Sequence, residues 1–372
     1  MTVTRKSESG FSLVELLVAI ALGVLVVGAA IMIFSSAMQN SFLVTQRATM
    51  QQNARSAMNT MMHDLSIAGT GIPQGGIQLP TGAGSSLSKY GCYTSTCYIV
   101  NNTFPNNHLY SVLPNDSGGP VTVEQTDALT VVFTDSSLPI NACTVSSINA
   151  TGTSVTLGGC ATAPPVGTPA YNDPAVGITV GDLIMLSNNN GTALGEVTNV
   201  AGGGVLTFAN ADSLNINQSG AASGNIAGLA NPGGGGVYPP TTAVRILLVT
   251  YYINILPGPD GTKPTSGMDA DDVPVLMKQI SGHATLPVAD SVEDLQVTYD
   301  LYDDGTGVAA ANVPNVNYAA TPPQSPNQIR DINVQLTSRT QGRATLSGNT
   351  MQRLTLSSSI SPRNLSFKNR YN

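Results

Sequence analysis

The sequence predicts an α+β protein in which one long N-terminal helix precedes a mainly antiparallel β head. Three observations support this prediction. Residues 16–34 are all apolar or glycine, an apolar helical periodicity continues to residue 68, and short alternating segments separated by Gly- and Asn-rich turns follow. Strands do not alternate with helices along the chain, so a parallel sheet covered by helices is not expected.

The apolar run is long enough to cross a membrane. Residues 16–34 would form about 28 Å of helix, and adding residues 11–15 gives a predicted transmembrane helix over 11–34 that matches a bilayer core of ~30 Å. Arg5 and Lys6 precede this segment, which predicts a cytoplasmic N-terminus and a head on the other side of the membrane. A cleaved signal peptide is the alternative, with small residues at 35–37, but the run is longer than such peptides carry.

Glu15 is a single carboxylate at the edge of this apolar run. A carboxylate inside a bilayer costs on the order of 2.5–3.5 kcal/mol even on lenient scales. A helix that serves only as a membrane anchor would not need this carboxylate, so we interpret Glu15 as a functional residue.

The helix is predicted to continue beyond the membrane over residues 35–70. Apolar side chains recur every three or four residues and predict one buried face: Leu43, Met50, Ala54, Ala57, Met58, Met61, Leu65 and Ala68. The methionines at 58, 61 and 62 are expected to pack against the head. Gly69, Gly71 and Pro73 predict the end of the helix.

Two β-rich regions are expected after the helix, at 71–240 and 241–372. In the first we predict a strand at 127–134, a hairpin of 143–148 with 154–157, a meander of 181–187, 193–200 and 205–208, and a flexible loop at 209–240. In the second we predict strands at 244–256, 275–280, 292–302, 329–337 and 351–360.

The four cysteines, Cys92, Cys97, Cys143 and Cys160, form two short-range pairs. An even count in an exported chain favours disulfides, and pairing of sequence neighbours is the simplest of three connectivities. No second close Cys or His pair completes a zinc site.

Charge is unevenly distributed in a chain whose net charge is −7. Residues 260–304 hold ten acids and two lysines (net −8), whereas residues 330–370 hold seven basic residues and one acid (net +6). We expect these segments to lie together in one domain, with a partner-facing patch as the alternative. The overall acidity argues against nucleic acid as the main partner.

No catalytic motif is found. The three histidines, His63, His108 and His283, stand outside any recognisable acid–base arrangement, and no nucleophile elbow, zinc-protease helix or phosphate-binding loop is present. Acidic loops at 269–272 and 300–305 could offer oxygen ligands to calcium, but their spacing departs from the EF-hand and solvated turns are preferred. We therefore expect no enzyme activity, no cofactor and no bound metal.

The segment Gly10-Phe11-Ser-Leu-Val-Glu15, after a basic leader, resembles the class III signal of type IV pilins and type II secretion pseudopilins. The resemblance implies that residues 1–10 are a leader, that a prepilin peptidase cuts after Gly10 and that the new amine of Phe11 is methylated. It also implies that Glu15 faces the Phe11 ammonium of a neighbouring subunit. Met32 stands where many major pilins have proline, so any kink would have to use Gly23 or Gly28.

The later segments resemble PilW-type minor pilins more narrowly. The resemblance is carried, in order, by residues 63–69, 127–131, 180–184, 292–299 and 332–336. It implies a non-enzymatic minor pilin of the inner membrane that joins other pilins through its helix, with a J-type minor pseudopilin as the nearest alternative. A membrane-anchored hydrolase or binding module is the rival from another class, and DNA binding by Arg363, Lys368 and Arg370 is only weakly supported.

Overall fold

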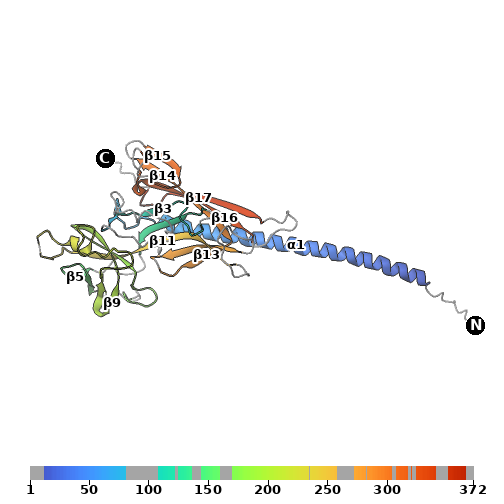
Figure 1. Cartoon of the computed structure of the whole chain (residues 1–372), viewed down its shortest axis with the longest axis horizontal. Helices are drawn as coiled ribbons and strands as arrows, with labels where there is room; N and C mark the ends of the chain where they lie inside the picture. The colour runs from blue at the N-terminus through green and yellow to red at the C-terminus, as the bar shows by residue number, and fades with distance from the viewer. Residues whose placement is uncertain are drawn as a thin grey trace, which may run out of the picture.

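The computed structural model describes residues 12–80, 108–121, 125–135, 144–159, 170–233, 235–257, 272–281, 283–303, 307–316, 320, 324–340 and 351–365. The shape is a long helix that carries a β head at its C-terminal end (Figure 1). The α+β prediction is therefore confirmed.

Helix α1 (Leu13–Ser66) runs for 54 residues without interruption. Its N-terminal half is exposed along its length, whereas one face of its C-terminal half is buried in the head: Met50, Ala54, Ala57, Met58, Met61, Asp64 and Leu65. This confirms the amphipathic continuation and the packing of the methionines. The helix stops where Gly69 and Gly71 adopt positive φ angles of +78° and +72°, conformations that side-chain-bearing residues rarely adopt.

Gly71 is also required by space, because a Cβ atom there would lie 2.5 Å from Cγ2 of Thr134. The chain can therefore turn closely against β4 after leaving the helix.

The largest sheet has seven antiparallel strands. Its main path is β13 (Leu286–Asp290), β12 (Val273–Ile280), β11 (Thr242–Leu256), β4 (Ala128–Thr134) and β3 (Val112–Asn115), and β7 (Leu183–Asn188) extends β11 and carries β8 (Gly191–Glu196). The sheet thus takes strands from both sides of residue 240, and β11 is the strand that joins them.

Three smaller sheets complete the head. One has the order β15 (Gly307–Val313), β14 (Val292–Asp303), β16 (Ile329–Arg339) and β17 (Arg353–Ile360). Another has the order β5 (Val145–Ile148), β6 (Ser154–Leu157), β10 (Val205–Thr207) and β9 (Asn199–Ala201), and β1 (Ile77–Gln78) pairs with β2 (His108–Leu109). Short 3-10 turns are η4 (Gly202–Gly204), η5 (Ile226–Leu229) and η6 (Pro326–Gln328).

The main core joins α1 to both large sheets, since the helix contacts β16, β17 and β13 (Figure 1). A second core lies between the β5–β6–β10–β9 sheet and the β7–β8 hairpin. This second unit lies at the end of the head farthest from the N-terminus of α1 (Figure 1).

Two predictions for the first β-rich region are wrong. The expected meander divides between sheets, because β7 and β8 belong to the seven-stranded sheet whereas β9 and β10 pair with β6. The expected flexible loop at 209–240 packs instead on both cores, with Leu214 and Ile216 in the main core and Ile226 and Leu229 in the second core. Its polar residues hold it in place, since the Asn225 side chain donates to three backbone carbonyls.

The acidic and basic segments lie together, as expected. Strand β14 pairs with β16, which pairs with β17. Glu293 on β14 forms an ion pair with Arg353 on β17, and Arg339 donates to the backbone oxygen of Asp272 at 2.6 Å. These contacts partly neutralise the two segments within one unit.

Candidate assembly site

The N-terminus of α1 is fixed by a reciprocal pair of hydrogen bonds. Ser12 Oγ accepts from the backbone N–H of Glu15 at 3.2 Å, and Glu15 Oε2 accepts from the backbone N–H of Ser12 at 2.9 Å. This capping box satisfies two N–H groups that a helix end leaves without partners. Glu15 is therefore held at the first turn of the helix, directly after the expected processing site. Gly10 and Phe11 themselves lie outside the described residues.

The exposed half of α1 is apolar around its whole circumference. Its large side chains from Leu13 to Phe34 are more than half exposed, and α1 is the one helix in the described part of the chain that is long and apolar enough to cross a membrane. A surface of this kind is stable in lipid or against other helices rather than in water.

In the other half of α1, one buried acid adds polar contacts with the head to the apolar packing already described. Asp64 Oδ2 accepts from Tyr251 Oη at 2.5 Å and from Lys278 Nζ at 2.5 Å. Asp64 is 6% exposed, and the Lys278 ammonium also lies 5.8 Å from the centre of the Tyr251 ring. Burial is the larger cause that raises the pKa of Tyr251 well above its usual range, and the nearby Asp64 carboxylate raises it further. Tyr251 therefore stays a hydrogen-bond donor. Asp64, Tyr251 and Lys278, which we call the Asp64 clamp, join α1 to β11 and β12.

Backbone contacts extend this attachment past the end of the helix. Gly69 N–H donates to Val132 O at 2.8 Å, and Thr134 N–H donates to Thr70 O at 2.9 Å. Nearer the N-terminus of α1, the Arg47 guanidinium donates to Gln352 Oε1 at 2.9 Å. These contacts hold the helix against the head both before and after Asp64.

Asp127 connects the two large sheets. Its Oδ1 accepts from the backbone N–H of Ser117 at 2.8 Å, and its Oδ2 accepts from that of Val297 on β14 at 2.7 Å. Burial raises the pKa of Asp127 to about 7; the two N–H donors oppose the shift, and the nearby Asp116 and Asp294 carboxylates add to it. This side chain therefore titrates near neutral pH.

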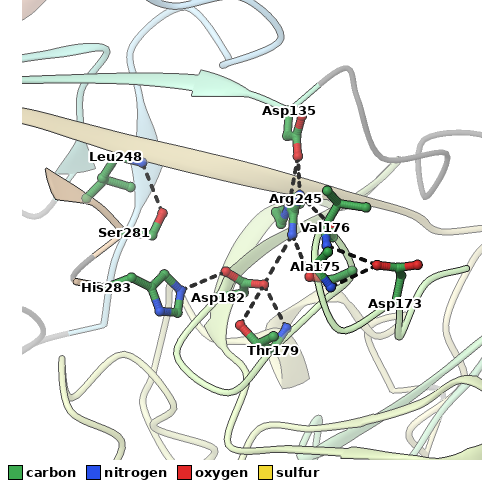
Figure 2. A network of polar contacts seen from close by, with 11 residues as sticks. Asp135, Asp173, Ala175, Val176, Thr179, Asp182, Arg245, Leu248, Ser281 and His283 are labelled. Carbon is green, nitrogen blue, oxygen red and sulfur yellow. Dashed lines mark hydrogen bonds and ion pairs between the residues drawn. The ribbon is translucent and has the colours of Figure 1, made fainter. Parts of the chain in front are cut away.

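An extensive polar cluster in the head surrounds Arg245 on β11 (Figure 2). Arg245 Nε donates to Asp135 Oδ2 at 2.9 Å, and its terminal nitrogens reach Gly177 O at 2.9 Å, Val176 O at 3.0 Å and Asp182 Oδ2 at 3.4 Å. The arginine therefore joins the end of β4 to the 173–182 segment that leads into β7.

Asp182 is held by a second set of contacts in the same cluster. His283 Nε2 lies 3.0 Å from its Oδ1, and Thr179 N–H donates to its Oδ2 at 2.8 Å (Figure 2). Burial acts to raise the pKa of Asp182, but the contacts with His283, Thr179 and Arg245 outweigh it and lower the pKa. The carboxylate is thus ionised in the folded head.

This cluster contains a serine, a histidine and an aspartate but lacks the geometry of a nucleophilic triad. Ser281 is 3% exposed, and its Oγ accepts from the backbone N–H of Leu248 at 3.3 Å. His283 turns its Nε2 towards Asp182 (Figure 2). The contacts of these residues are those of a structural link between β11, β12 and the 173–182 segment.

The proposed calcium ligands are engaged by protein groups where they are described. Asp300 Oδ1 accepts from Asn312 N–H at 2.7 Å and from Asn333 Nδ2 at 3.3 Å. Within the residues whose positions are given, no group of three or more His, Cys, Asp or Glu side chains could hold a metal ion. The four cysteines and the 269–271 segment lie outside the described residues, so both disulfides remain predictions.

Comparison with known proteins bears on the N-terminus. Residues 5–31 match the prokaryotic N-terminal methylation motif. No curated protein and no solved structure gave a significant match. The motif supports a pilin-like or pseudopilin protein that is anchored by one helix and assembles with other pilins. Its span takes in Gly10, Phe11, Ser12 and Glu15, the residues of the expected processing site and of the capping box.

Two features of this site were not anticipated. Ser12 caps the helix, although the Ser-x-x-Glu spacing at 12–15 is a visible signature of a capping box. The Asp64 clamp was also missed. Its signal was a single acid on an otherwise apolar helix face, which requires a partner elsewhere in the fold.

Proposed function

We propose that the chain is a minor pilin, structural and non-catalytic, that assembles through α1 into a type IV pilus or its priming complex. The observation that carries this proposal is the continuity of α1. The methylation motif at 5–31 runs without a break into a helix whose second half forms part of the core of the head. Each subunit would thus present an apolar rod rigidly joined to a β head.

Glu15 is the proposed assembly charge. A prepilin peptidase would cut after Gly10 and methylate Phe11, leaving an ammonium next to the first turn of α1. A carboxylate and an ammonium are each unfavourable in an apolar bundle and favourable as a pair. Glu15 would therefore align each helix against the N-terminus of its neighbour.

The proposed location before assembly is the inner membrane, with residues 1–10 in the cytoplasm and the head in the periplasm. Arg5 and Lys6 support this orientation. In a filament of parallel helices, the side of the head away from the N-terminus of α1 faces the neighbour that is closer to the tip. The unit of β5, β6, β9 and β10 lies on that side of the head (Figure 1) and would occupy the space of such a neighbour. This favours a position near the tip.

A J-type minor pseudopilin of a type II secretion system would use the same helix and the same charge. The PilW-type alternative is supported by the order of the resembling segments from residue 63 to residue 336. Both alternatives share the assembly mechanism and differ in the machine that they serve.

The test compares Glu15→Ala with Ser12→Ala in the full-length protein, expressed with its own assembly machinery. Ser12→Ala removes one capping bond and keeps the carboxylate. Glu15→Ala should lower the amount of this protein in sheared filaments by tenfold or more while leaving its membrane level unchanged, and Ser12→Ala should incorporate like wild type. Equal incorporation of wild type and Glu15→Ala would refute the assembly role.

A further inference from the structure

Strand β17 is a sheet edge with a regular register. It pairs with β16 over eight residues, from Arg353↔Arg339 to Ile360↔Ile332, without a register shift, and pairs with no other described strand. At its start, Thr340 N–H donates to Gln352 O at 2.9 Å, and Gln352 N–H donates to Thr340 Oγ1 at 3.2 Å. The backbone groups of residue 352 therefore point towards β16.

The direction of the remaining backbone groups follows from this starting point. Successive residues of an antiparallel strand turn their N–H and C=O groups to opposite sides. Positions 354, 356, 358 and 360 thus bond to β16. Thr355, Ser357 and Ser359 direct their N–H and C=O groups away from the sheet.

Natural sheets protect their edges with prolines, bulges, charges, short strands or covering segments. The other described edges of the larger sheets follow this rule: β3 contains Pro114, β13 contains Pro287 and a register shift in its pairing, and β15 and β5 have register shifts. Strand β9 has three residues, and β8 is covered where Asn217 exchanges hydrogen bonds with the backbone of Glu196. Strand β17 begins with the exposed Arg353, which forms an ion pair with Glu293. Beyond that residue, 354–360 contain no proline, no charged residue and no register shift, and no described strand covers them.

The two faces of β17 differ in a way that suits a further strand. Leu354, Leu356 and Ile360 are half-buried, and Leu356 and Ile360 pack on the main core, whereas Thr355 and Ser357 are exposed on the other face. Because these apolar side chains are only half covered, a strand added beside β17 would bury the rest of them.

The edge also lies next to the assembly helix. Strand β17 contacts α1 (Figure 1). Gln352, the residue before β17, accepts a hydrogen bond from Arg47 of α1. Parallel packing of α1 against the helix of a neighbouring subunit, on the side of α1 that carries β17, would bring the head of that neighbour alongside β17. The edge is therefore continuous with the surface through which the subunit assembles.

We propose that β17 pairs with an extended strand of the head of a neighbouring, different pilin-like subunit, so that one sheet continues across the two heads. This inference rests on the proposed function and deepens it by assigning the surface that meets a partner pilin. The partner strand is expected to alternate apolar residues towards α1 with small or polar residues on the outer side. Thr355, Ser357 and Ser359 would supply the backbone hydrogen bonds.

The test places the photo-cross-linker benzoylphenylalanine at position 355, 357 or 359 of the full-length protein in assembling cells. Cross-linked residues are then identified by mass spectrometry. The expected result is a set of cross-links to one strand of a second protein that carries a methylation motif. As the cross-linker is moved from position 355 to 357 and 359, the cross-linked residue should shift in one direction along that strand. Cross-links to a second copy of this chain, to a protein without the motif, to scattered residues or to nothing would overturn the proposal.

A matched pair of variants tests the backbone contact directly. Ser357→Pro removes an outward N–H and leaves the β16 pairing intact, which edge strands tolerate, whereas Ser357→Thr keeps the N–H. Ser357→Pro should lower the cross-link yield from position 359 at least tenfold, and Ser357→Thr should leave it unchanged. Ser357→Lys should act like the proline variant if the latter proves unstable, and undiminished yield in a folded variant would contradict the pairing.

This result can be separated from a failure of the proposed function. If Glu15→Ala abolishes incorporation, but filaments that keep Glu15 show no cross-link from β17, the assembly role of Glu15 stands and the strand pairing is wrong. If Glu15→Ala incorporates normally, the proposed function itself fails.

Discussion

Asp64 is the residue on which the attachment of the helix depends. Asp64→Asn would leave the Lys278 ammonium, whose side chain is 20% exposed, without its ionic partner. Removing one member of a buried pair costs about 3–5 kcal/mol, and partial access to water reduces this to about 2–3 kcal/mol here. We expect that loss in the free energy of unfolding of the detergent-solubilised full-length protein, measured by chemical denaturation.

Two variants make the Asp64 prediction specific. Asp290→Asn, an exposed acid on β13, should change stability by less than about 0.5 kcal/mol. Adding Lys278→Met to Asp64→Asn should restore most of the loss, because no unpaired ammonium remains. If the double variant loses as much free energy of unfolding as the two single variants added together, the ion pair is not the origin of the effect.

Asp127 predicts a pH dependence with a definite sign. Its folded pKa of about 7 lies above the ordinary value of 3.8. A raised folded pKa means that its contribution to stability is fully present below the unfolded pKa and is lost as pH rises through about 7. The slope from this group reaches at most about 1.4 kcal/mol per pH unit between roughly pH 4 and pH 7.

Asp127→Asn should flatten this slope. It should also lower stability at every pH, because only the amide oxygen can accept a hydrogen bond and the N–H of Ser117 or of Val297 then faces an NH2 group. Thermal midpoints of the full-length protein from pH 4 to pH 8 would measure the effect. The Asp290→Asn variant should keep the wild-type slope, and an unchanged slope in Asp127→Asn would disprove the assignment.

At the scale of elements, the long periodic segments were predictable and the short ones were not. Helix α1 and the alternating strands β14 and β16 repeat one period over many residues, so local pattern determines them. Strands β1, β2 and β13 have two to five residues and owe their conformation to a neighbour in the sheet. Turn residues such as Asn190-Gly191 mark where strands end, but they carry no information on which sheet a strand joins.

The same reasoning applies to the assembly site. Glu15 could be identified because a charge in an apolar run is visible locally. The partners of Asp64 are 187 and 214 residues further along the chain, so no spacing in the sequence connects them.

The Arg245 cluster predicts a local effect on the 173–182 segment. Lysine cannot reproduce the fork that contacts Asp135 and two carbonyls at once. Arg245→Lys should therefore lower the stability of this segment by about 1.5–3 kcal/mol. Hydrogen exchange of residues 176–182 should speed up by roughly tenfold or more, while Arg55→Lys, an exposed arginine of α1, should leave it unchanged. Equal exchange in both variants would contradict the role of the cluster.

At the scale of the whole molecule, the proposed function gives the long helix and the β head different parts in assembly. The exposed apolar half of α1 would provide packing surface and the capped first turn a charge, and the head would provide the β17 edge and the distal unit of β5, β6, β9 and β10. The buried contacts of Asp64 and the backbone bonds after Ser66 fix the head relative to the helix. A neighbour that packed on the helix, as proposed, would therefore meet the head in one orientation.

The most direct test of this account is mass spectrometry of the N-terminus of the protein extracted from membranes, with and without prepilin peptidase. We expect the mature chain to begin at an N-methylated Phe11 when the peptidase is present and to retain residues 1–10 when it is absent. A chain that still begins at Met1 with the peptidase present, or one cut after Ala37, would contradict it.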